Sequence, residues 1–119
     1  MTLQEAQSEH EEAKKRQDKF YRDTISPTLL VSLNEWATKE RPYLGHFLTA
    51  VLENNLHGAF SRADDRSRES LYTICQYIYN RLPSVCWGSK EKVEAWQGSE
   101  VPAYKRTDPD LVWPANYDA

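Results

Sequence analysis

The chain has 119 residues, of which 28% are charged and 39% are apolar, and its formal net charge is -3. This length suits a single domain. A mean hydropathy of -0.78, with no apolar run near the ~20 residues that a bilayer requires, excludes a membrane-spanning protein. Residues 1–25 hold six acids and five bases, and residues 43–97 hold six of each. Direct binding of DNA or RNA needs a basic surface and is therefore not expected.

The cysteine content and the polar N-terminal segment predict a cytoplasmic protein. Residues 1–16 contain no apolar stretch of the kind that a secretory signal needs. Cys75 and Cys86 are therefore expected to be free thiols in a reducing compartment.

Residues 1–25 are predicted to be a separate segment, a charged N-terminal helix over residues 2–23. Thr2 followed by Glu5 is typical of a capping box at a helix start. Six residues then recur with heptad spacing, of which only the first and last are large and apolar: Leu3, Ala6, His10, Ala13, Gln17 and Phe20. Two interpretations follow, an arm that packs on its own domain and a helix that pairs with a partner or with a second copy. A homodimer through this helix belongs to the second interpretation.

Residues 26–97 are predicted to form a helical core domain. Ser26 and Pro27 favour a helix start, and Pro42 favours its end. A further helix is expected over residues 43–60, where apolar residues follow the spacing of a core-facing stripe. A break at His57-Gly58 is compatible with that stripe.

A charged connection, residues 61–70, leads to the next predicted helix, for which Asp64, Asp65 and Ser67 are candidate caps and which runs to about Leu82. One face of this helix is apolar and is expected to be buried: Leu71, Ile74, Cys75, Ile78 and Leu82. Ser89 is expected to cap a short last helix. Four residues should then close the end of the bundle: Val85, Trp87, Val93 and Trp96.

The other face of the helix that runs to about Leu82 carries Tyr72, Gln76 and Tyr79. Tyrosines at helical spacing either pack against another segment of the chain or form an exposed patch for a partner. Both interpretations remain open at this point.

Residues 98–119 form a tail with three prolines and no helical periodicity. Tyr104, Trp113 and Tyr117 give this tail more aromatic area than an ordinary linker has. It either packs over its own bundle, docks on a partner through Leu111, Val112 and Trp113, or stays disordered.

Four short motifs stand out within residues 43–97: Phe47-Leu48 with Ala50-Val51-Leu52, Arg62-Ala63-Asp64, Tyr79-Asn80, and Cys86-Trp87-Gly88-Ser89. On these motifs the chain resembles a set of small helical proteins of unknown function that bacteriophages and prophages carry. The resemblance implies a genomic context and identifies no active site.

The usual signatures of catalysis are missing from the sequence. The three histidines and two cysteines lack zinc-ligand spacing. Asp64-Asp65 is flanked by arginines, which favours a capped, ion-paired turn over acid–base chemistry. A nucleophilic pair of Cys86 with a histidine has no supporting motif, and the four glycines form no phosphate-binding loop. No catalytic, metal-binding or cofactor-binding residue is predicted.

The sequence therefore predicts an all-α protein, a small bundle of about four to five helices with a charged N-terminal helix and an extended aromatic tail. The predicted function is non-enzymatic. The chain would bind a host protein or complex stoichiometrically, and its phage context suggests inhibition of a host defence system. The predicted partner-binding residues are exposed aromatics and arginines: Tyr72, Tyr79, Arg62, Arg66, Arg68, Trp113 and Tyr117. The alternative is a small-ligand or nucleotide-sequestering module, with tyrosines stacking on a base and arginines holding phosphate.

Overall fold

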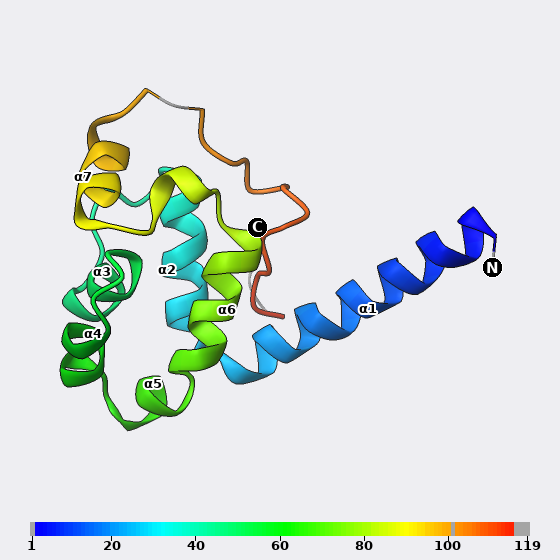
Figure 1. Cartoon of the computed structure of the whole chain (residues 1–119), viewed down its shortest axis with the longest axis horizontal. Helices are drawn as coiled ribbons and strands as arrows, with labels where there is room; N and C mark the ends of the chain where they lie inside the picture. The colour runs from blue at the N-terminus through cyan, green and yellow to red at the C-terminus, as the bar shows by residue number, and fades with distance from the viewer. Residues whose placement is uncertain (1, 101, 116–119) are drawn as a thin grey trace.

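The computed structural model describes residues 2–100 and 102–115, and every regular element in these ranges is a helix. In chain order the elements are α1 (Leu3–Thr24), α2 (Pro27–Ala37), α3 (His46–Leu52), α4 (Leu56–Arg62), α5 (Asp65–Glu69), α6 (Leu71–Arg81), the 3-10 turn η1 (Ser84–Cys86) and α7 (Lys90–Gly98). The all-α prediction is confirmed. The predicted four to five helices are too few, because the described residues form seven α-helices (Figure 1). None of these helices is both long enough and apolar enough to span a bilayer.

The helix expected over residues 43–60 is two helices, α3 and α4. Asn54 adopts a positive φ of 62°, a left-handed conformation that asparagine tolerates better than most residues. The side chain of Asn55 then accepts a 2.9 Å hydrogen bond from the N–H of Gly58 and caps α4. The chain therefore breaks at Asn54-Asn55, three residues before the break that the sequence suggested.

The charged connection over residues 61–70 contains a helix of its own, α5. Asp64 caps α5 by accepting a 2.7 Å hydrogen bond from the N–H of Ser67. The second helix of the chain, α2, is shorter than expected and ends at Ala37. Lys39 follows with a φ of 63°, so the chain leaves helical geometry before it reaches Pro42.

The first helix, α1, is anchored to the rest of the molecule through its C-terminal half, from Lys14, which donates to the carbonyl of Pro109 at 2.6 Å, onwards. Its start has the predicted capping box, in which the N–H of Glu5 donates to Thr2 Oγ1 at 3.1 Å and the N–H of Thr2 donates to Glu5 Oε2 at 3.2 Å. Residues 2–13 are exposed at every position and project away from the other helices (Figure 1). Tyr21, by contrast, is buried in the core.

The core is formed by α2, α6 and α7 together with the C-terminal end of α1, α3 and the tail. Its largest fully buried side chains are Trp36, Tyr21, Tyr77, Ile25, Leu30, Leu33, Leu52 and Ile74. The indole N–H of Trp36 donates to the carbonyl of Cys86 at 3.1 Å, and that of Trp96 donates to the carbonyl of Trp36 at 3.0 Å. Both buried indoles therefore have hydrogen-bond partners. The expectation that Val85 closes this end of the core is wrong, since Val85 is 48% exposed.

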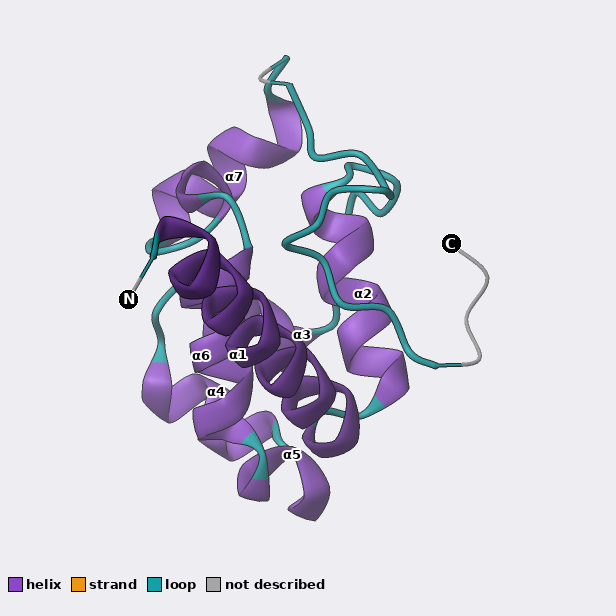
Figure 2. Cartoon of the chain, turned by 90° about the vertical axis from the view of Figure 1, so that its right-hand side faces the viewer, coloured by secondary structure: helices purple, strands orange, loops and turns teal. Residues whose placement is uncertain are grey.

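The tail, over its described residues 102–115, runs from α7 across the molecule and passes between α1 and α2 (Figure 2). The N–H of Tyr104 donates to the carbonyl of Ala37 at 3.1 Å. Leu111 and Val112 are buried in the core. The contacts of these residues match the first of the three interpretations of the tail, packing on its own bundle. Tyr117 lies outside the described residues.

Candidate partner-binding groove

An open groove of about 520 Å³ runs along the exposed side of α6. Residues from α3, α6 and the connection between η1 and α7 line it: Val51, Asn54, Tyr72, Cys75, Gln76, Ile78, Tyr79, Asn80, Trp87 and Gly88. None of these residues is charged. Aromatic and aliphatic side chains supply most of its wall, and amide side chains supply the polar groups. A surface of this composition suits apolar groups of a ligand or partner.

Helical spacing places the main wall of the groove. Tyr72, Cys75 and Tyr79 lie at i, i+3 and i+7 on one face of α6. At the far end, the ring of Trp87 packs against Tyr79, with ring centroids 5.8 Å apart and an interplanar angle of 55°. The groove therefore has an aromatic end wall.

Gly88 fixes the position of Trp87. The N–H of Gly88 donates a 2.7 Å hydrogen bond to the carbonyl of Leu52, which joins the connection before α7 to the end of α3. Gly88 has a φ of 119°, a conformation that residues with a Cβ atom rarely adopt. The backbone conformation and hydrogen bond of Gly88 therefore explain why glycine follows Trp87, independently of any role of the groove.

The two predicted binding tyrosines on α6 are the most exposed large residues of the groove. Tyr72 is 76% exposed and Tyr79 is 73% exposed. A smaller hollow of about 50 Å³ shares Val51, Asn54 and Cys75 with the groove and reaches Leu56 on α4. Leu56 is itself 64% exposed. The apolar surface therefore continues from α6 onto α4, beyond what isolated surface residues would give.

Cys75 lies in this groove and not in the core, where the sequence placed it. Its side chain is exposed, while partial burial against its neighbours raises the pKa of the thiol. Cys75 is therefore a protonated, accessible group at neutral pH and belongs to the packing surface of the groove.

The three predicted binding arginines lie on α4 and α5, and none of them lines the groove. Arg62 Nη1 donates to the carbonyl of Gly58 at 3.4 Å. Arg68 bonds to the carbonyl of Phe60 and to Asp65, each at 3.3 Å, and lies over the ring of Phe60. Arg66 is exposed on the same short helix. The combination of tyrosines and arginines expected for a nucleotide site is therefore not assembled in the groove.

Trp113, the predicted binding residue of the tail, packs within its own domain. Its indole N–H donates to the carbonyl of Arg106 at 3.0 Å, and the Arg106 guanidinium lies 5.2 Å from the ring centroid. Its own carbonyl accepts from Arg22 Nε at 3.0 Å. These contacts give the half-buried Trp113 a role in fixing the tail to α1.

Cys86 and Asp64, two of the residues considered as catalytic groups from their sequence, have structural roles. Cys86 is fully buried, and burial raises the pKa of its thiol to about 12, so the thiolate that a nucleophile needs does not form at neutral pH. The hydrogen bond from the backbone of Ser67 lowers the pKa of Asp64, in keeping with its role as a helix cap. Among the residues that the structure describes, no three His, Cys, Asp or Glu side chains are placed to hold a metal ion.

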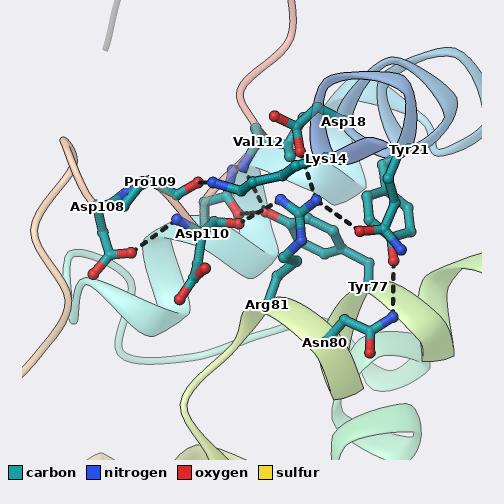
Figure 3. A network of polar contacts seen from close by, with 12 residues as sticks. Lys14, Asp18, Tyr21, Tyr77, Asn80, Arg81, Asp108, Pro109, Asp110 and Val112 are labelled. Carbon is teal, nitrogen blue, oxygen red and sulfur yellow. Dashed lines mark hydrogen bonds and ion pairs between the residues drawn. The ribbon is translucent and has the colours of Figure 1, made fainter. Parts of the chain in front are cut away.

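A second, polar hollow of about 430 Å³ lies between α1, the end of α6 and the tail. Figure 3 shows the polar contacts of Arg81 at this place. The floor of the hollow is Arg81, which is 4% exposed. Arg81 Nη2 lies 2.6 Å from Asp18 Oδ1 and donates to Gln17 Oε1 at 2.9 Å, and Nη1 donates to the carbonyl of Asp110 at 3.2 Å. These intramolecular contacts join three segments of the chain, so Arg81 is a structural residue.

Sequence reasoning found the tyrosines of the groove but missed three of its other residues, Asn54, Cys75 and Trp87. Asn54-Asn55 was a usable signal, because paired asparagines favour turns and caps inside an apolar periodic segment. Trp87 was expected to close the end of the bundle, whereas its half-buried ring also lines the groove, a position that depends on contacts between distant segments.

Comparison with known protein families, with curated proteins and with solved structures found no match for this chain. The resemblance of residues 43–97 to phage and prophage proteins therefore stays a prediction.

Proposed function

We propose that the chain is a non-enzymatic interaction protein that binds a partner protein stoichiometrically through the groove on α6. The observation that carries the proposal is the exposure of Tyr72 and Tyr79 beside an uncharged groove of about 520 Å³. Tyrosine and tryptophan are enriched among the residues that dominate interface energies, because they bury a large area at little entropic cost. Trp87 is the third aromatic residue that lines the groove.

The proposed occupant is an amphipathic segment of the partner, helical or extended, that inserts apolar side chains. The groove carries no charge that would recognise an acidic or basic peptide. The amides of Asn54, Gln76 and Asn80 instead offer hydrogen bonds to polar groups at the edge of the segment. This chemistry corresponds to an apolar helix face lying in a groove.

The proposed partner is a host protein or complex, and the proposed effect is inhibition of a host defence system. This step rests on the phage resemblance of residues 43–97 and not on the groove. A protein that acts by occupying a surface needs no catalytic group, which agrees with the structural roles of Cys86 and Asp64.

The volume of the groove also falls within the range of small-ligand sites. The arginines lie outside the groove, so a phosphate group there would have no cationic partner from its wall. The second candidate is therefore an uncharged planar ligand that stacks on Tyr79 and Trp87. Native mass spectrometry of the purified protein distinguishes the two candidates, because a bound small molecule adds a defined mass to the chain.

The test of partner binding compares the Tyr72→Ala, Tyr79→Ala double variant with Tyr43→Ala. Tyr43 is a matched control, since it is 74% exposed and does not line the groove. Each protein is used to capture binders from a bacterial host lysate, and the binder is then purified for calorimetry. We expect one-to-one binding, unchanged by Tyr43→Ala and weakened about 100-fold or more in the double variant. Equal affinity of the double variant would rule out the groove as the binding site.

Cys75 provides an independent readout of the same surface. A maleimide should modify Cys75 in the free protein, since its side chain is exposed, and leave the buried Cys86 unmodified. A bound partner should slow this modification, and protein modified beforehand should no longer bind. Modification at the free rate in a saturated complex would contradict binding at the groove.

A further inference from the structure

The first half of α1 presents an exposed helix surface. Residues 2–13 are exposed at every position, and Leu3 at the start is 76% exposed. An isolated helix of this length is marginal in water, because most helical stability in proteins comes from packing of one face. A partner for this surface would supply that packing.

The charges of α1 are separated along its length. The acidic half, residues 2–13, carries four acids and no lysine or arginine: Glu5, Glu9, Glu11 and Glu12. The basic half, residues 14–22, carries five bases: Lys14, Lys15, Arg16, Lys19 and Arg22. The single acid of the basic half, Asp18, is paired with Arg81 of its own chain. Two copies of α1 in antiparallel orientation would place each acidic half beside a basic half.

The heptad positions of α1 are symmetric about the point between Glu11 and Glu12. In an antiparallel pair centred there, Leu3 meets Phe20 of the second copy, Ala6 meets Gln17, and His10 meets Ala13. Phe20 is 52% exposed and so remains accessible to a second helix. The same alignment brings the two large apolar residues of the seam together at both ends.

We propose that two copies of the chain associate through antiparallel pairing of their α1 helices. Glu9 and Arg16 each precede a seam residue by one position, and in this arrangement they lie opposite each other across the pair. The two-fold symmetry creates this ion pair twice. Glu11 and Glu12 occupy outer positions of the heptad, where like charges are separated and hydrated.

A hollow lies beside this face of α1, and at its edge Gln17 accepts a 2.9 Å hydrogen bond from Arg81 of the same chain. The hollow of about 430 Å³ beside α1 is lined by the seam residues His10, Ala13 and Gln17 on one side and by α6 and the tail on the other. The N-terminal half of the second α1 would lie over this hollow, where Lys14 contributes positive charge to its wall. The acidic half of the incoming helix matches that charge.

A parallel pair satisfies these observations less well. It would place the two acidic halves side by side, and it would place Arg16 beside the region of Tyr21, away from any acid of the seam. Charge reversal at Arg16 therefore separates the two orientations.

The test uses full-length Glu9→Arg, Arg16→Glu and Lys15→Glu in sedimentation equilibrium over a wide range of concentrations. Lys15 is the matched control, because its change in charge equals that at Arg16 while its position points away from the seam. We expect a concentration-dependent dimer for the unmodified chain and for Lys15→Glu. Each seam variant alone should dimerise about tenfold more weakly or worse, because like charges then oppose each other twice.

An equimolar mixture of Glu9→Arg and Arg16→Glu should recover association as a heterodimer, since each variant then faces the opposite charge in both pairs. A chain that stays monomeric at all concentrations would overturn the proposal. So would a dimer that neither seam variant weakens, or a mixture that does not recover association. These outcomes are independent of the groove, because Tyr72 and Tyr79 are unchanged in every variant.

Discussion

The hydroxyl group of Tyr77 in α6 donates a 2.6 Å hydrogen bond to Oδ1 of Asn34 in α2. The same hydroxyl accepts from the N–H of Val112 at 2.8 Å, and Asn34 Nδ2 donates to the carbonyl of Val112 at 2.7 Å. Both backbone groups of one tail residue are thereby bonded to side chains of two core helices. Burial raises the pKa of Tyr77 above its ordinary range, which keeps the hydroxyl protonated and able to donate.

Removing the Tyr77 hydroxyl should destabilise the protein and loosen the tail. In Tyr77→Phe, the N–H of Val112 and Oδ1 of Asn34 lose their partner in a buried place, which we expect to cost about 1 to 3 kcal/mol. Urea denaturation measures the loss, and hydrogen exchange at Val112 should become faster. The control Tyr79→Phe changes an exposed ring and should stay within about 0.5 kcal/mol of the unmodified chain.

The buried residues of the tail should contribute to folding stability. Leu111 is 7% exposed, and Leu111→Ala is expected to lower the free energy of unfolding by about 2 to 3 kcal/mol through lost burial and a residual cavity. Thermal and urea denaturation both report this change. An unchanged stability would instead support the interpretation of the tail as a segment that docks on a partner.

The ion pair of Arg81 with Asp18 should matter more than the surface pairs of the chain. Asp18→Asn leaves a guanidinium that is 4% exposed without its counter-charge, and we expect a loss of about 3 kcal/mol. Asp23→Asn removes the partner of Lys19 from an exposed pair of similar length, 2.7 Å. That change should cost no more than about 0.5 kcal/mol. Equal losses in urea denaturation would show that the burial of Arg81 does not strengthen its pair.

Glu40 should make stability depend on pH in the acid range. Hydrogen bonds from Arg106 to its carboxylate, at 2.8 and 2.5 Å, are the main cause that lowers the pKa of Glu40 below 4.5. A lowered pKa in the folded state adds stability that is present above the unfolded value and is lost as pH falls through the folded value. The advantage of the unmodified chain over Glu40→Gln should therefore shrink as pH falls below 4.5. Urea denaturation at neutral and acid pH measures it, and a constant difference would contradict the prediction.

Capping residues and prolines in the sequence predicted where several helices begin, because a helix start depends on residues that are close together in the chain. Thr2 with Glu5, Pro27 and Ser89 each mark a helix start that the structure confirms. The split of residues 43–60 was missed because apolar periodicity continues across Asn54. The periodic stripe predicted burial correctly at Leu48 and Leu52 but wrongly at Leu56 and Phe60, which are 64% and 56% exposed. It also predicted one continuous helix wrongly, since a single residue in left-handed geometry interrupts a helix without interrupting the spacing.

The candidate site was predictable only in part for a similar reason. Tyr72 and Tyr79 share a helix face, so spacing alone grouped them. Whether that face is covered depends on the path of the tail, and the tail passes on the other side, where Tyr77 receives it. The same path buries Arg81, although arginine is seldom buried and its burial is therefore not expected from sequence.

The bond between Asn34 and Val112 joins residues 78 positions apart in the chain. Most helical domains fold fast because their contacts are local. Closing a loop of this length costs conformational entropy before the hydrogen bonds of Val112 can stabilise the chain. During synthesis, a nascent chain that has emerged from the ribosome as far as α7 contains all seven helices that the structure describes. Asn34 and Tyr77 cannot yet form their hydrogen bonds to Val112, because Val112 has not been released. Final consolidation of the core is therefore expected to be a late step of synthesis, and a chain stalled before the tail should remain a substrate for chaperones.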